Sequence, residues 1–172
     1  MARFLVTTRA VKWNGRHWSQ PDAVDAALDI EALSMDDVLL WDLEGLPASS
    51  RAAIEAAAVC GHAFWNGLLQ ALLETDCVAG ALTPLAEREF ILPQPVSRFP
   101  GHLEFAFRHA RVREVLYERI SPAKRKALHM LAAEWLQAHS LPELSDVGHI
   151  AYHLGAAEAH DDAAKWRARL AE

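Results

Sequence analysis

The sequence predicts a mainly helical fold in which three short helices precede a β-hairpin and further helices follow it. Apolar residues recur at helical spacing between residues 49 and 87, and again between 109 and 170. Between these regions the period changes to two, because 90–92 and 103–107 have the character of strands. The Pro/Gly-rich segment 93–101 is typical of a loop. Three helices followed by a two-stranded hairpin is the order of a winged-helix domain, with the loop as the tip of the wing.

The predicted organisation has three parts. Residues 1–33 form an N-terminal hairpin and linker, residues 34–120 the winged-helix domain, and residues 121–172 the start of a helical repeat. Two short amphipathic helices at the end of the chain resemble one repeat unit, which needs neighbours to bury its apolar face.

The hairpin near the N-terminus is predicted from Asn14-Gly15, which supplies the two positive-φ positions of a type I′ turn. This turn would pair 11–13 with 16–18 and bring Trp13 and Trp18 to one face. The stretch that follows, to residue 33, is weakly helical or irregular.

Capping signals place the helices of the predicted winged-helix domain. Ser34 is a good N-cap, Asp37 completes a capping box, and Gly45 with Pro47 ends this first short helix. Further helices are expected over 49–60, 63–74, 77–87 and, after the hairpin, 109–120.

A new helix is predicted to begin at Ser121-Pro122, where an N-cap residue is followed by proline at the first helical position. This helix is expected to reach His139. A helical pair over 143–154 and 161–170 follows, with its turn at Gly155.

Charge is distributed unevenly, with a net value of -6. Residues 19–89 hold thirteen acidic side chains against two arginines, whereas 108–126 hold seven basic against two acidic. The helix before the wing is flanked by Asp76, Glu87 and Glu89, with Arg88 as its nearby cation, and the wing tip offers Arg98. Because phosphate backbones attract cations, this pattern disfavours nucleic-acid binding.

The length of the apolar runs, the N-terminal residues and the cysteines indicate the cellular compartment and whether the chain contacts a membrane. No apolar run approaches the roughly 20 residues of a membrane span, and the N-terminus is a poor signal peptide. Cys60 and Cys77 make no disulfide framework and no CxxC pair. We expect a cytoplasmic protein with no membrane partner.

Motifs of catalysis and metal binding are missing from the sequence, so no catalytic or metal-ligating residue is assigned. There is no phosphate loop and no GxSxG elbow. His149 and His153 have the i, i+4 spacing of zinc ligands, but Ile150 occupies the place of the glutamate in HExxH, which favours packing or capping roles. Cys60, close to His62 on an apolar helix end, is expected to be a buried structural cysteine.

Several segments in order resemble the winged-helix region of bacterial STAND-class signalling ATPases, which are joined to adenylate cyclases, kinases or transcriptional activators. Segment 46–64, from Leu-Pro to Ala-Phe, is similar to the opening of that domain. Segment 105–117, with the sequence FAFRHARVREVLY, is similar to its region after the wing. Residues 125–133 and 149–166 look like the beginning of its tetratricopeptide-like array, and 13–18 like a hairpin found before the winged helix.

This resemblance implies a role for the start of the helix after the wing. His109 matches the histidine of a Met-His-Asp-type motif, which would approach the β-phosphate of a bound nucleotide and report its state. Arg108 and Arg111 would add positive charge beside it, and Ala110 stands where aspartate is usual in the plant and animal branches. An alternative role for His109 is to cap its helix or to form a hydrogen bond across the core.

The implied function is a non-catalytic regulatory segment that couples nucleotide state to partner binding or oligomerisation. No cofactor is expected in this chain. ATP or ADP is implied for the parent protein, whose nucleotide-binding domain would precede residue 1. Partners would be that domain, another protein or a second copy of the chain. Two alternatives stay open: a free-standing winged-helix DNA-binding regulator, and a helical adaptor that captures partners with Trp135, Tyr152 and Trp166.

Overall fold

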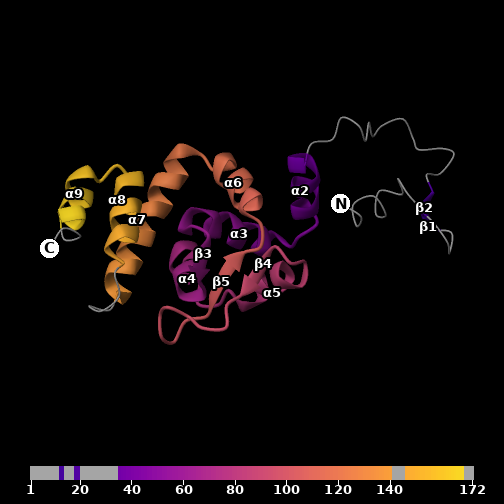
Figure 1. Ribbon diagram of the computed structural model, residues 1–172, viewed down its shortest axis with the longest axis horizontal. Coiled ribbons are helices and arrows are strands. Elements are labelled where there is room, and N and C mark those ends of the chain that lie inside the picture. The colour runs from indigo at the N-terminus through magenta and orange to yellow at the C-terminus, as the bar shows by residue number, and fades with distance from the viewer. Residues whose placement is uncertain (1–11, 14–17, 20–34, 141–145, 169–172) are drawn as a thin grey trace. The chain divides into compact units, whose positions relative to one another are not determined.

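The computed structural model describes residues 12–13, 18–19, 35–140 and 146–168. The chain divides into two compact units, residues 1–45 and residues 46–172. The described part is mainly helical with short antiparallel strands, so the prediction of a mainly helical chain is confirmed (Figure 1). Within the described residues, no helix is long and apolar enough to cross a membrane.

The described residues of the first unit form a small hairpin and one helix. Strand β1 (Lys12–Trp13) pairs antiparallel with β2 (Trp18–Ser19), with Trp13 opposite Trp18. This register leaves four residues between the strands, so the predicted two-residue connection at Asn14-Gly15 is wrong. Helix α2 (Met35–Glu44) occupies the predicted place. The expected N-cap at Ser34, the packing of Trp13 on Trp18 and the stretch 20–33 lie outside the described residues.

The second unit begins with three helices and a three-stranded sheet. Helix α3 buries its alanine-rich face with Ile54 and Val59, as the sequence predicts for a core helix. The sheet is antiparallel, in the order β3-β5-β4. The elements are, in chain order, α3 (Ala48–Cys60), β3 (Ala63–Trp65), α4 (Asn66–Leu73), α5 (Ala79–Glu87), β4 (Ile91–Pro93) and β5 (Glu104–Phe107).

Strand β3 corrects the prediction that 63–74 is one helix and that the sheet has two strands. The spacing of Phe64, Leu68 and Leu72 fits a helix, but aromatic residues at 64 and 65 also suit a strand. Pairing with β5 decides the outcome, because it satisfies backbone groups along that strand. The ladder is extended by the Phe107 amide, which donates to the His62 carbonyl at 3.0 Å, and by the Asn66 amide, which donates to the Leu103 carbonyl at 3.0 Å.

The described residues after the sheet form four further helices of the second unit. The N-cap predicted at Ser121 is present, since the hydroxyl of Ser121 accepts a hydrogen bond from the Lys124 amide at 3.4 Å. The predicted turn at Gly155 is wrong: Gly155 lies inside a helix, which ends where Ala159 donates to the Leu154 carbonyl. The helices are α6 (Ala110–Arg119), α7 (Pro122–His139), α8 (Val147–Ala156) and α9 (His160–Ala168).

Aromatic packing joins the sheet to α7. The Trp65 ring on β3 lies 6.2 Å from the Trp135 ring on α7, centroid to centroid, in a stacked arrangement. Phe99, from the loop between β4 and β5, is buried against both rings, at 4.7 Å and 5.2 Å. The hairpin loop is therefore anchored on α7, within the compact second unit.

Candidate functional site

The residues that the sequence predicts to sense phosphate lie at the start of α6. His109 is the N-cap residue, with extended backbone (φ -129°), an exposed side chain and no side-chain capping bond. Arg108 forms an ion pair with Glu89 at 2.6 Å, and Arg111 forms one with Glu114 at 3.2 Å. Exposed pairs of this kind contribute little stability, so a phosphate could displace either carboxylate at low cost.

A second, more enclosed site lies where α3, β3, α6 and α8 meet, and we call it the junction cavity. Its volume is about 390 Å³. It is lined by Cys60, Gly61, His62, Ala63, Trp65, Leu68, Arg98, Glu104, Arg113, Leu136, His149, Tyr152 and His153. The lining mixes aromatic walls with basic and imidazole side chains, which is the composition of a ligand site rather than of a packing defect.

Arg113 is the unusual residue of the junction cavity. It lies one helical turn after His109, and its guanidinium carbon is 5.7 Å from the centre of the Tyr117 ring. Its Nε is buried and donates no hydrogen bond to any part of the chain that the structure describes. A buried donor without an acceptor costs about 1–3 kcal/mol. Sequence reasoning counted Arg113 only as part of a basic stretch, because burial at a single helical position cannot be recognised from charge.

The cavity wall continues into a buried chain of hydrogen bonds. The hydroxyl of Tyr117 lies 2.9 Å from Nε2 of His129, and Nδ1 of His129 lies 2.8 Å from Nδ1 of His153. His153 also bonds to the backbone of Cys60. These hydrogen bonds thus connect α6, α7, α8 and the end of α3.

The donor and the acceptor of each of these hydrogen bonds can be assigned from the last acceptor, the backbone carbonyl of Cys60. The helix-end carbonyl of Cys60 only accepts, so the ring of His153 donates to it and, when neutral, has its other nitrogen free to accept. His129 therefore donates to His153, and Tyr117 donates to His129. Burial first, and then the charge of Arg113, lowers the pKa of His129 to about 4. Burial and then the neighbouring His129 lower the pKa of His153 to about 3.

Cys60, which the sequence predicts to be a buried structural cysteine, is half-buried at the end of α3. Burial raises the pKa of its thiol, and the Sγ donates to the Ala56 carbonyl at 3.5 Å. A protonated, hydrogen-bonded thiol is a poor nucleophile. Cys77, in contrast, is exposed.

The histidine pair of α8 does not present two free imidazoles. His149 is exposed, while His153 is buried and uses both ring nitrogens in the chain described above. Among the residues that the structure describes, no group of three or more ligating side chains is arranged to hold a metal ion.

The aromatic residues proposed for an adaptor face do not form one. Trp135 is buried between Trp65, Phe99 and His139, whereas Tyr152 is about half exposed, at 49%. Trp166 is half-buried on α9. The expectation of a shared face for the three is therefore wrong, because helix α7 turns Trp135 towards the sheet.

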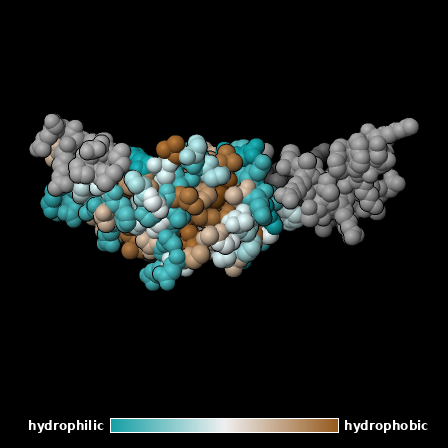
Figure 2. Space-filling model, turned by 90° about the horizontal axis from the view of Figure 1, so that it is seen from below, coloured by the Kyte–Doolittle hydropathy of each residue, from teal (hydrophilic) through white to brown (hydrophobic). Residues whose placement is uncertain are grey.

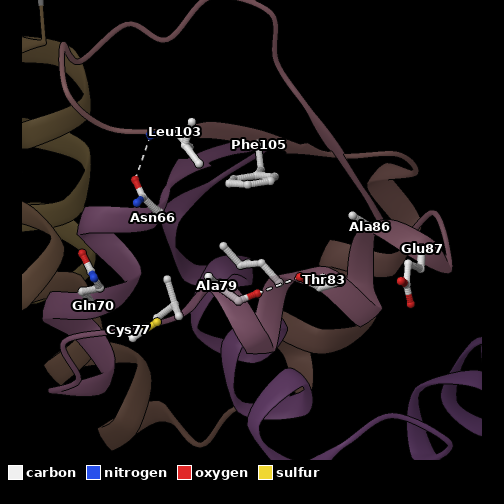
Figure 3. Close-up of a pocket in the computed structure, with 11 residues that line it drawn as sticks. Asn66, Gln70, Cys77, Ala79, Thr83, Ala86, Glu87, Leu103 and Phe105 are labelled. Atoms are coloured by element: carbon white, nitrogen blue, oxygen red, sulfur yellow. Dashed lines mark hydrogen bonds between the residues drawn. The ribbon is translucent and has the colours of Figure 1, made fainter.

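A separate apolar groove lies between α4, α5 and β5, with a volume of about 470 Å³. Leu103 and Phe105 form one side, and Ala79, Thr83 and Ala86 of α5 form the other (Figure 3). Hydrophobic side chains also gather on the face seen in Figure 2. Leu103, which directly precedes the central strand β5, is 65% exposed.

No protein-family model matches the chain, and a search of curated proteins finds no match. The likeness to STAND-class ATPases therefore depends on the motifs in the sequence and on their order.

Proposed function

We propose that this chain is a winged-helix regulatory segment of a STAND-type signalling ATPase, followed by its first helical repeat. In this role it is non-catalytic, and it couples the nucleotide state of a neighbouring domain to partner binding or oligomerisation in the cytoplasm. The order helix, strand, two helices and hairpin, with the sheet order β3-β5-β4, supports the winged-helix assignment.

The observation that carries the proposal is the position of α6. Its N-cap residue is His109, which the resemblance places beside a nucleotide phosphate. Two turns later, Tyr117 bonds to His129 of α7, and that bond continues to His153 of α8. A displacement at the start of α6 would therefore move the helices of the proposed repeat, because α6 carries His109 at its start and contacts α7 through Tyr117.

Nucleotide contact in this scheme needs a phosphate to compete with Glu89 and Glu114 for Arg108 and Arg111. The start of a helix supports this exchange, since its free amides and dipole favour an anion. We expect no submillimolar ATP binding by this chain alone, because it lacks the phosphate loop that would hold the triphosphate. Isothermal calorimetry with ATP and ADP checks this expectation.

The DNA-binding alternative has little support from the helix before the hairpin. Helix α5 contains no Lys or Arg, carries Glu87 at its end, and borders the apolar groove. Arg98 of the hairpin loop forms an ion pair with Asp146 at 2.6 Å. A major-groove reader needs cations at these places.

Fluorescence anisotropy with a labelled DNA duplex at low salt separates the two functions. The proposal predicts no salt-dependent binding at micromolar protein. Binding that is weakened by Arg98→Ala or Arg88→Ala, but not by the matched change Arg119→Ala on α6, would favour the DNA-binding regulator instead.

A further inference from the structure

We propose that the junction cavity binds a small organic molecule bearing an oxyanion group, a carboxylate or a phosphate, and that Arg113 holds this group. The site differs from the predicted phosphate contact at His109, and the inference does not depend on the proposed function. The inference follows from the partners of the two arginines that line the cavity, Arg98 and Arg113.

The two arginines of the lining differ in their partners. Arg98 is bound to the Asp146 carboxylate, which is 1% exposed. Arg113 faces no carboxylate within 4 Å in the described part of the chain, and its Nε–H is buried without an acceptor. A planar guanidinium with a free, desolvated N–H is suited to a carboxylate or phosphate oxygen.

The remaining polar groups around Arg113 do not neutralise it. Glu104 is the acidic residue in the lining of the cavity, and its Oε2 already accepts from the Trp65 indole at 2.9 Å and from the Arg98 amide at 2.8 Å. His153 is held neutral within the buried hydrogen-bond chain. His149, exposed on α8, is available as a second donor to the same anion.

The walls of the cavity indicate the body of the ligand. Trp65 and Tyr152 offer aromatic surface, and the volume of about 390 Å³ lies within the range of small-molecule sites. A ring-sized molecule with one anionic group fits this combination of aromatic walls and the Arg113 guanidinium.

Occupancy would tie α8 to α3, β3 and α6, because the lining comes from all four elements. A ligand that binds only the folded arrangement stabilises it in proportion to its occupancy. We therefore expect binding to raise the melting temperature of the chain.

The test uses benzoate and phenyl phosphate as probes, with benzyl alcohol and sodium chloride of equal ionic strength as controls. Binding is followed by backbone amide NMR and thermal unfolding. We expect saturable shifts at 61–63 and 149–153 and a raised melting temperature with at least one anionic probe, and neither effect with the controls. The two anionic probes distinguish a carboxylate from a phosphate site.

Variants locate the site. Arg113→Gln should weaken binding by about ten-fold or more, and His149→Gln, at an exposed position that tolerates change, by a few-fold. Arg119→Gln, on the same helix but away from the cavity, should bind as the wild type does. Absence of saturable binding by both anions in the wild type, or full binding in a folded Arg113→Gln variant, would overturn the proposal.

Discussion

Nδ1 of His129 and Nδ1 of His153 lie 2.8 Å apart, in a buried contact between α7 and α8. One proton lies between two nitrogens at this distance, and because burial lowers the pKa of both histidines, both rings are neutral at pH 7. The packing of α7 against α8 therefore depends on two uncharged imidazoles. Protonation of His153 at Nδ1 would place two donors face to face inside the core.

Acid should therefore destabilise the chain through these two histidines. Above pH 6.5 both rings are neutral whether the chain is folded or unfolded, and they add no pH dependence. Below pH 6.5 the unfolded chain takes up protons that the folded chain does not, since the folded pKa values are about 4 and about 3. The free energy of unfolding should fall by about 2 kcal/mol for each histidine between pH 7.5 and pH 5.

Urea unfolding across this pH range measures the effect. The double variant His129→Leu/His153→Leu should lose most of the decrease, whatever its stability at pH 7.5. His160→Gln, at an exposed position on α9, should retain it. An identical decrease in the double variant would show that other groups bind the protons.

Two glycines in neighbouring helices should respond in opposite ways to alanine. Gly67 is buried in α4, and a methyl group there would collide with the His102 ring, which packs on Trp135 at 5.2 Å. Gly67→Ala should destabilise by about 1–3 kcal/mol. Gly80, exposed on α5 with open space around it, should gain about 0.5–1 kcal/mol as alanine.

Thermal unfolding compares the two variants, and His102→Ala supplies the internal control. If the collision is the cause, the cost of Gly67→Ala should largely disappear in the His102→Ala background. A cost that persists there would point to the helix backbone itself.

The ion pair between Arg98 and Asp146 should hold the hairpin loop to the start of α8. The Asp146 carboxylate is buried and also accepts from the Ser140 hydroxyl at 3.3 Å. Arg98→Met should cost about 1–3 kcal/mol, less than for a fully buried pair because the Arg98 side chain is 31% exposed. A double-mutant cycle with Asp146→Asn checks this: strictly additive changes would mean that the pair has no net coupling.

The two cysteines should differ in reactivity. Burial raises the pKa of the Cys60 thiol, whereas Cys77 is exposed. At pH 8 in native buffer, we expect a disulfide reagent to modify Cys77 at least about ten-fold faster than Cys60. Cys77→Ser should leave only the slow phase, and Cys60→Ser only the fast one. Equal rates in the two variants would contradict the protection of the Cys60 thiol by its half-buried position and its hydrogen bond to the Ala56 carbonyl.

Local signals in the sequence predicted most of the helices. Ser121 and Pro122 mark the start of α7 because an N-cap hydroxyl and a proline at the first helical position act within a few residues. The same reasoning failed at Ala63–Trp65, where the strand depends on β5, some forty residues away. The spacing of apolar residues carries no information about a strand partner so far away in the sequence.

In the candidate sites too, residues marked by a local motif were predicted from the sequence, and residues marked only by tertiary packing were not. His109 was predicted from a motif, and it does begin α6 as an exposed N-cap residue. Arg113 was not predicted, since its distinction is a buried Nε without an acceptor, which arises from packing among α3, α6 and α8. His129 and His153 were likewise separated by 24 residues before folding placed their rings in contact.

The dissociation rate of ADP tests the central proposal most directly, in a protein that joins this chain to its nucleotide-binding domain. If the start of α6 reads the nucleotide, His109→Ala should release ADP about ten-fold faster than the wild type, a loss of about 1.4 kcal/mol. The matched change Arg119→Ala, at the other end of α6, should release it at the wild-type rate. Equal rates for His109→Ala and the wild type would contradict the role of this helix in sensing nucleotide.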